Sequence, residues 1–410
     1  MTQTQLKRSL SFYQVAFYGL GTILGAGIYA LVGKIAGQAG MMAPTAFLLA
    51  GVLAAFSAFS YAELSSRFPQ SAGAANYIQQ GFGIKNLSLF FGLGIALSGI
   101  VSAGTLMHAF VGYFQQFFPG VEGWMVMVAL LIFMGALAWW GIQESAWLIT
   151  IITLIEVGGL VLILWVARGS FSALPEALPS FFIPESVGSM GTMAGFLAGT
   201  FLAFYAFIGF EDMVNVAEET KNPTKVMPRA IIFALIGSTI LYMGIAVVAV
   251  LTLAPADLLA SGAPLADVFV AATGKDPVLI TLIGLFAVIN GVMAQIIMAS
   301  RVLYGMSCFQ WVPKCFSMIC SHRQTPVFSI WVVVGIILFF ALAIDMQGLA
   351  TITSFITLTL FALVNLALWK VKRSGPAPKG TFVIWSWVPM VGFVANMFFV
   401  GHKVMTLLAL

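Results

Sequence analysis

The sequence predicts an all-α membrane protein that crosses the bilayer many times. Of its 410 residues, 61% are hydrophobic and only 8% are charged, and the mean hydropathy is +1.04. A soluble fold of this length needs far more charge to cover its surface. Apolar runs of spanning length also recur along the whole chain. We therefore expect one transmembrane domain over 1–410, embedded in the lipid bilayer, with no nucleic-acid partner.

Eleven apolar runs are candidate helices. The first five lie within about 13–167, the next five within about 191–369, and the eleventh at about 382–404. In order, they cover about 13–37, 42–66, 87–117, 124–141, 147–167, 191–217, 230–254, 277–306, 327–345, 348–369 and 382–404.

The basic residues predict the orientation of these helices. With the N-terminus inside, most of the 18 Lys and Arg residues fall in cytoplasmic loops. The exceptions are Lys34, Arg168, Lys275 and Lys403. This bias follows the positive-inside rule, and an odd number of helices then places the C-terminus outside.

The first run contains glycines that a continuous helix would not favour. In "YGLGTILGAGIYALVGKIAG" (18–37), Gly19, Gly21, Gly25 and Gly27 fall within a few residues. Each costs a helix interior about 1 kcal/mol relative to alanine, which indicates an interruption near mid-membrane. The alternative is close helix packing, because Gly21 and Gly25 also form a G-x-x-x-G pattern.

The sixth run contains a second anomaly, because Glu211 and Asp212 lie well inside an apolar stretch. A carboxylate at the membrane centre costs roughly 2.5–3.5 kcal/mol on insertion scales. Acids in the first turn of a second half-helix would offset its dipole, but that explanation also requires a break. Irregular helices five apart are typical of inverted repeats with a binding site between two broken helices.

Two broken helices side by side suit a zwitterionic ligand. A break leaves amide donors unpaired at the start of the second half and carbonyl acceptors unpaired at the end of the first half. The donor end favours an anion and the acceptor end a cation. Glycines allow a ligand to approach the backbone. Any amino acid carries the matching carboxylate and ammonium groups.

Four segments resemble motifs of the amino acid–polyamine–organocation superfamily, and especially its cationic amino acid transporter-like bacterial permeases. They are "GTILGAGIYALVG" (21–33), "YAELSSRFPQSAG" (61–73), "FYAFIGFEDMVNVAEETKNPTKVMPRAI" (204–231) and "NGVMAQIIMASRVLYGMS" (290–307). The resemblance implies a LeuT-like five-plus-five inverted repeat with alternating access. It implies a secondary active permease or exchanger for amino acids, proton-linked, in the cytoplasmic (inner) membrane of a bacterium. The family typically has twelve helices, against the eleven expected here.

The resemblance also implies substrate contacts at the two breaks. The backbone amides of Gly25, Ala26 and Gly27 at the first break would bind the carboxylate. The carbonyls of Ile23, Tyr205 and Ile208 would bind the ammonium. The aromatic side chains of Tyr205 and Phe207 would close over the substrate.

Four ionisable residues are candidates for coupling or gating. Proton-coupled relatives often carry a lysine in the fifth helix, whereas "TLIEVGGL" (153–160) places Glu156 there. Because burial favours the neutral form of a carboxyl group, Glu156 could take up a proton. It could equally bind Na⁺, pair with a cationic substrate or pack as a neutral residue. Glu211 matches a glutamate that the family keeps after the break, and the role of Asp212 stays open.

The third run and the end of the second supply further candidates. Met107 is a candidate wall residue of the pocket, and His108 is either a pH-sensing residue or a histidine satisfied by a neighbour. Glu63 and Arg67, four residues apart, are expected to form an ion pair that orients the inner end of the second helix, or simply stabilises it.

Three other functions are alternatives to a proton-linked amino acid permease. They are a polyamine or amine transporter, a sodium-coupled amino acid symporter, and a transport-dead amino acid sensor. An intramembrane enzyme is not expected, because no H-E-x-x-H or comparable constellation occurs. Cys308, Cys315 and Cys320 include no C-x-x-C pair, so we expect no metal site and no cofactor.

Overall fold

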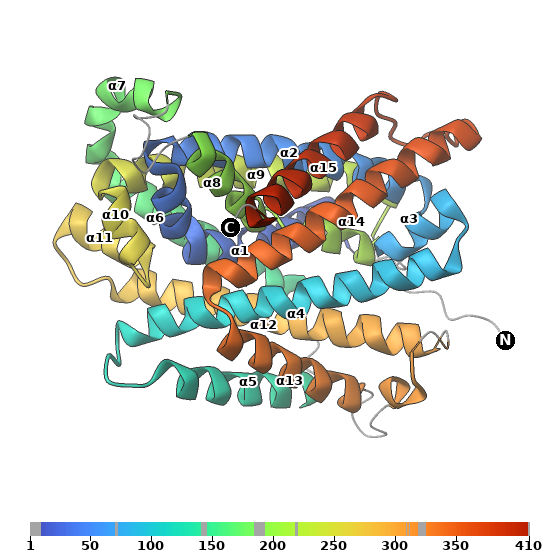
Figure 1. Cartoon of the computed structure of the whole chain (residues 1–410), viewed down its shortest axis with the longest axis horizontal. Coiled ribbons are helices and arrows are strands. Elements are labelled where there is room, and N and C mark those ends of the chain that lie inside the picture. Colours follow the sequence, from blue (N-terminus) through green and yellow to red (C-terminus); the bar gives the residue numbers. More distant parts are fainter. Residues whose placement is uncertain are drawn as a thin grey trace.

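The computed structural model describes residues 10–69, 73–140, 146–183, 193–217, 220–308, 310, 312–318 and 325–408. These residues fold almost entirely into helices, and most of the long helices run along the longest axis of the molecule (Figure 1). Eight helices in the described part are long and apolar enough to cross a membrane. The prediction of an all-α polytopic membrane protein is confirmed.

Within the described residues, the principal helices, including some too short or too irregular to count among those eight, fall into two groups of five and a final helix. The first group is α1 (Phe12–Ala39), α2 (Ala43–Arg67), α4 (Lys85–Gln115), α5 (Gly123–Trp140) and α6 (Ala146–Val166). The second is α8 (Met193–Ala206) with the 3₁₀ helix η4 (Phe210–Val216), then α9 (Pro223–Thr252), α12 (Val278–Cys308), α13 (Val327–Ala343) and α14 (Met346–Ser374), followed by α15 (Val388–Leu408).

Shorter elements connect the long helices. None of them was expected from the sequence, because an apolar run this short does not stand out in a hydropathy profile. They are η1 (Gly40–Met42), α3 (Gly73–Phe82), η2 (Ala167–Ala173), α7 (Leu174–Ala177), η3 (Leu178–Phe181), α10 (Pro255–Ala260), α11 (Pro264–Thr273) and η5 (Lys314–Ser317). In Figure 1, α7, α10 and α11 gather at the left end of the molecule, and α3 lies at the right.

The packing of the two groups is related by an internal symmetry. Helix α1 packs on α9 and α6, and its counterpart α8 packs on α2 and α14, which are the counterparts of α9 and α6. Helices α2 and α9 pack on each other, and so do α4 and α12. This exchange of equivalent partners is the pattern expected of a five-plus-five repeat.

The first helix of each group is interrupted, as the sequence predicted. Gly25 has non-helical dihedral angles (φ −17°, ψ −141°) in the middle of α1. In the second group, α8 ends at Ala206 and η4 begins at Phe210. The turn between them includes Gly209, whose φ of 133° is a conformation that favours glycine.

The two breaks lie directly against each other. A Cβ atom on Gly27 would come within 2.9 Å of the Cα of Ala206, and a Cβ on Gly209 would overlap the carbonyl group of Thr22. Only glycine allows so close an approach of the two backbones.

Gly25 thus forms the break, and a Cβ on it would meet no atom within 4 Å, so it is not half of a G-x-x-x-G packing pair. Gly21 packs against Thr153 and Gly27 against Ala206.

Helix α10 covers the second half of α1. The Lys34 ammonium donates to the carbonyl oxygen of Leu259 in the last turn of α10 (2.5 Å). Cβ atoms on Gly33 and Gly37 would collide with Leu258 and Leu259 respectively. This half of α1 is therefore fixed to α10 by close packing and by a charged hydrogen bond.

A buried ionic network fixes the C-terminal end of α2. The Glu63 carboxylate is fully buried, and it accepts hydrogen bonds from Arg67 (2.8 Å from Nε) and from Lys372 of α14 (2.8 Å). Its second oxygen also accepts the backbone N–H of Ile384 (2.9 Å). The predicted Glu63–Arg67 pair is confirmed, and tertiary contacts extend it to the segment between α14 and α15.

We expect Glu63→Gln to destabilise the protein by about 3–5 kcal/mol, because it leaves two buried cations without their carboxylate. The melting temperature in detergent should fall by several degrees. Glu176→Gln, at an exposed position in α7, is the matched control and should leave it unchanged. An unaltered melting temperature in Glu63→Gln would contradict this account of the network.

Candidate functional site

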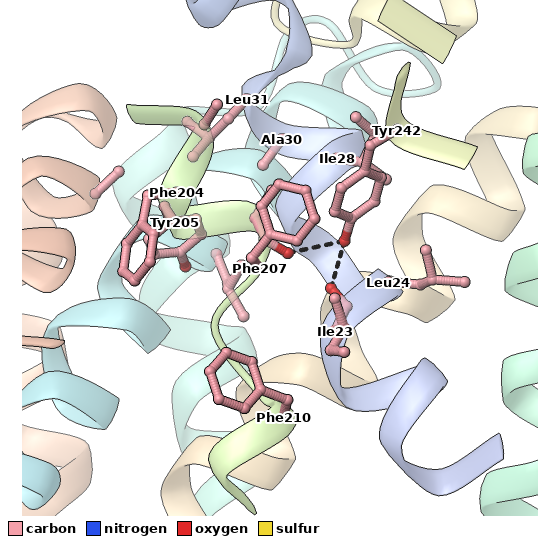
Figure 2. Close-up of a cluster of buried hydrophobic side chains, with 14 of the residues drawn as sticks. Ile23, Leu24, Ile28, Ala30, Leu31, Phe204, Tyr205, Phe207, Phe210 and Tyr242 are labelled. Carbon is pink, nitrogen blue, oxygen red and sulfur yellow. Dashed lines mark hydrogen bonds between the residues drawn. The ribbon is translucent and has the colours of Figure 1, made fainter. Parts of the chain in front are cut away.

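The carbonyl ends of the two breaks converge on one side chain, Tyr242 of α9. Its hydroxyl group donates to the carbonyl oxygens of Ile23 (2.5 Å) and Ala206 (2.8 Å). Figure 2 shows both hydrogen bonds between the ribbons of α1 and α8. Ile23 lies just before the break of α1, and Ala206 is the last residue of α8. The acceptor groups freed by the two interruptions therefore share a single hydroxyl partner.

The donor end of the second break has its own partner. The Glu211 carboxylate accepts the backbone N–H of Gly209 (2.8 Å), directly before η4. Glu211 thus caps the start of the second half-helix, as acidic side chains do at helix N-termini. This geometry agrees with the simpler of the two explanations offered for Glu211 and accounts for a half-buried carboxylate at this depth.

The first break borders open space. A Cβ atom built on Gly25 would have no atom within 4 Å outside its own chain neighbours. Gly27, two residues further, is packed against Ala206. The side chain of Ala26 lies outside the described part of the structure. The backbone at Gly25 is therefore the point of α1 at which a small ligand would find room.

The aromatic residues predicted for the site, Tyr205 at the end of α8 and Phe207 in the turn that follows, are both buried. The Tyr205 hydroxyl lies 2.9 Å from the hydroxyl of Ser102 on α4, which links α8 to α4. The Phe207 ring packs edge-on against the Tyr242 ring, with 5.2 Å between centroids. The Tyr205 carbonyl accepts the N–H of half-buried Ile208 (3.1 Å). This carbonyl thus already has a backbone partner within the turn.

Glu156 faces the break from α6. It is fully buried, and Thr153 and Gly159 lie one turn to either side on the same face. A Cβ on Gly21 would overlap Thr153, and one on Gly159 would come within 2.8 Å of the Tyr29 hydroxyl. Glu156 therefore lies opposite the stretch of α1 that contains Gly25.

In the part of the chain that the structure describes, the carboxyl group of Glu156 has no ion-pair partner and no regular hydrogen bond. Neither carboxylate oxygen makes a hydrogen bond of normal geometry, and the nearby Thr153 hydroxyl also lacks a partner. Asn290 of α12 is the polar side chain that interacts with the carboxyl group, while Tyr29 donates to the Glu156 backbone carbonyl (2.8 Å). Buried polar groups are rarely left without regular partners, so Glu156 and Thr153 differ from the other buried polar side chains near the break.

The remaining candidates are His108, Met107 and Asp212, and each is accounted for by local contacts or by burial. His108 makes a hydrogen bond through Nε2 to the carbonyl oxygen of Ile344 (3.0 Å), at the turn between α13 and α14. A neighbour thus satisfies this histidine. Met107 is fully buried in α4. Asp212 is half-buried in η4, where its N–H donates to the Gly209 carbonyl (3.1 Å).

Sequence reasoning missed Tyr242 and Thr153. Tyr242 lies at the middle of the apolar run predicted for 230–254. A buried phenol needs a hydrogen-bond partner, so a tyrosine at mid-membrane depth is a usable signal. Thr153 gave no such signal, because threonine is tolerated in membrane helices by bonding to its own backbone.

The geometry gives the break two different sides. The acceptor side, or acceptor pole, consists of the carbonyls of Ile23 and Ala206, which share the Tyr242 hydroxyl. On the other side, the backbone at Gly25 leaves helical geometry and borders open space. Polar and glycine residues, rather than a metal-binding cluster, form this region. Among the described residues, no three His, Cys, Asp or Glu side chains are grouped to hold a metal ion.

Comparison with known proteins identifies the family. A family model described as amino acid permease matches residues 10–408. The chain is 29% identical over 395 residues to cationic amino acid transporter 3, mitochondrial, of Arabidopsis thaliana (91% of this chain, 63% of the relative). It is 27% identical to the branched-chain amino acid permease BcaP of Bacillus subtilis (strain 168), covering 91% of this chain and 83% of the relative.

The chain spans 60% to 65% of the length of three plant cationic amino acid transporters that it matches. Among solved structures, it resembles the substrate-bound outward-open state of a Na⁺-coupled sialic acid symporter. The TM-score is 0.64 at 13% identity, over 96% of this chain and 89% of the other. This likeness shows the LeuT-like fold. The chain belongs to the amino acid permease family, within the amino acid–polyamine–organocation superfamily.

Proposed function

We propose that this protein is a secondary active transporter that moves amino acids across the cytoplasmic membrane by alternating access. The observation that supports this most directly is the contact of two broken helices, whose carbonyl acceptors meet at one point beside the open space at Gly25. An α-amino acid carries the complementary ammonium and carboxylate groups. No bond of the substrate is made or broken, because transport needs only binding that differs between two states.

The proposed contacts follow the two sides of the break. Amides of Gly25, Ala26 and Gly27 bind the carboxylate. Carbonyls near the breaks bind the ammonium, and Ile23 is the strongest candidate because its carbonyl lies just before the break and accepts from a side chain, the Tyr242 hydroxyl. The aromatic and apolar side chains around the bound substrate are those of Tyr205, Phe207, Ile208 and Met107. The N-terminus of the chain lies on the cytoplasmic side of the membrane.

We further propose that Glu156 couples transport to protons. Its carboxyl group is fully buried, faces the break and lacks a regular hydrogen bond. A proton neutralises such a group at no structural cost, whereas a buried unpaired charge is expensive. Sodium coupling is the second candidate, because a carboxylate and a nearby threonine hydroxyl are oxygen ligands that suit a hard cation.

The first experiment is thermal stabilisation of the purified protein by the twenty amino acids and by polyamines, at about pH 5.5 and about pH 7.5. A ligand that binds only the folded state raises the melting temperature. We expect a shift with a few amino acids. A shift with polyamines alone would instead favour an amine transporter, and binding without uptake in liposomes would favour a sensor.

We expect Gly25→Ala to weaken binding of the stabilising amino acid at least tenfold, because the added methyl group enters the space beside the break. Gly27→Val should abolish binding as well, and it should also lower stability because the side chain meets the backbone of α8. Gly158→Ala on α6, where a Cβ also meets nothing, is the control. Unchanged uptake by Gly27→Val would disprove the broken-helix site.

We expect Glu156→Gln to remove the pH dependence of uptake into proteoliposomes, because glutamine resembles the protonated acid and cannot release a proton. Exchange of substrate at equal concentrations on both sides should persist. Glu122→Gln, at an exposed position, is the matched control. Retention of pH-driven accumulation by Glu156→Gln would exclude the proposed role, and loss of a sodium requirement would favour sodium coupling.

A further inference from the structure

Tyr242 of α9 lies where the carbonyl ends of the two breaks meet. Its hydroxyl group lies between the carbonyl oxygens of Ile23 and Ala206, at 2.5 Å and 2.8 Å. These are the acceptor groups that face the break on the α1 and α8 sides. The hydroxyl therefore occupies the acceptor pole that an ammonium group of a substrate would need.

The tyrosine ring is held firmly in this place. Tyr242 is fully buried, and its ring packs against Phe207 (5.2 Å between centroids) and Phe47 (5.7 Å). Phe207 comes from the turn of the second break and Phe47 from α2. The ring position thus depends on its own helix α9, on α2 and on the turn of the second break, which rules out an accidental surface contact.

A single hydroxyl satisfies two carbonyl groups incompletely. A tyrosine carries one proton, so only one of the two short contacts can be a full hydrogen bond at any moment. No backbone N–H outside the regular helical bonds donates to either carbonyl in the described residues. A primary ammonium group has three donors and a positive charge, and charge-assisted hydrogen bonds are stronger than neutral ones.

We propose that Tyr242 is a built-in competitor for the substrate ammonium, and that displacing it requires a primary ammonium group with at least two free N–H donors. This inference rests on the proposed function and makes its substrate class narrower. An α-amino acid with an unmodified amine can bridge Ile23 and Ala206 in place of the hydroxyl. A fully N-methylated analogue cannot, because it carries the charge but no donor.

The competition has a consequence for affinity. The hydroxyl must leave the two carbonyls before the ammonium can enter, so its hydrogen bonds are lost on binding. The same displacement shifts the Tyr242 ring, which contacts Phe207 and Phe47. Occupation of the acceptor pole is thereby transmitted to α9 and α2, which pack on each other along their length.

The test is calorimetric titration of L-leucine, L-arginine and L-alanine into the wild-type protein and into Tyr242→Phe. The variant lacks the competing hydroxyl and leaves both carbonyls without their side-chain donor, so we expect its Kd to be roughly five- to tenfold lower than that of the wild type. Its melting temperature without amino acid should fall for the same reason.

Tyr113→Phe is the matched control. The Tyr113 hydroxyl donates to the carbonyl oxygen of Tyr29 (3.0 Å), which also lies on α1 but beyond the break. This variant should lose stability without any gain in affinity. Equal or weaker binding by Tyr242→Phe would overturn the proposal, since it would mean that the hydroxyl is neutral or contacts the substrate directly.

A second measurement is independent of whether the variant folds. N,N,N-trimethyl-L-leucine should bind the wild-type protein at least a hundredfold more weakly than L-leucine, although the two share charge and side chain. Equal binding of the two compounds would overturn the requirement for N–H donors. If the wild type binds none of the twenty amino acids in the thermal test, the proposed function fails and this inference fails with it; if it binds one and Tyr242→Phe gains no affinity for it, only this inference fails.

Discussion

The structure depends on one constraint, which is that backbone groups freed by an interrupted helix must find partners where water is scarce. The break at Gly25 and the turn before η4 release carbonyl and amide groups inside the membrane domain. Tyr242 supplies a hydroxyl to the carbonyls of Ile23 and Ala206, and Glu211 supplies a carboxylate to the N–H of Gly209. These contacts join α9 to both breaks and tie Glu211 to the turn before η4.

Close packing of the two breaks allows one hydroxyl group to bond to carbonyls of two helices. It can do so because Gly27 lies against Ala206 and Gly209 against Thr22, with no side chain between the backbones. Larger residues would separate the two breaks and leave each to be satisfied alone. The same proximity brings carbonyl acceptors from both repeats to one point, where a single cationic group can reach them.

Three carboxylates of the membrane domain differ in how their charge is compensated. Glu63 is paired with two cations and a backbone N–H, so it fixes α2 to the segment between α14 and α15. Glu211 caps a half-helix, where the local dipole favours its charge. Glu156 has neither arrangement, because no cation lies within ion-pair distance of it among the described residues. A carboxyl group in that situation is the one whose charge state can follow a transported ion.

The sequence by itself determined the membrane class, the two interrupted helices and the Glu63–Arg67 pair, because hydropathy, the cost of glycine in a helix and the spacing of charges along a helix are local properties. Only the tertiary structure decided which groups the breaks would bind. Nothing local to Leu241–Met243 says that Tyr242 reaches Ile23, 219 residues away, or that His108 is satisfied by Ile344 instead of facing the site. The unpaired state of Glu156 is likewise a property of its neighbours on α1 and α12. Such pairings depend on which helices become adjacent, and that is settled by packing over the whole chain.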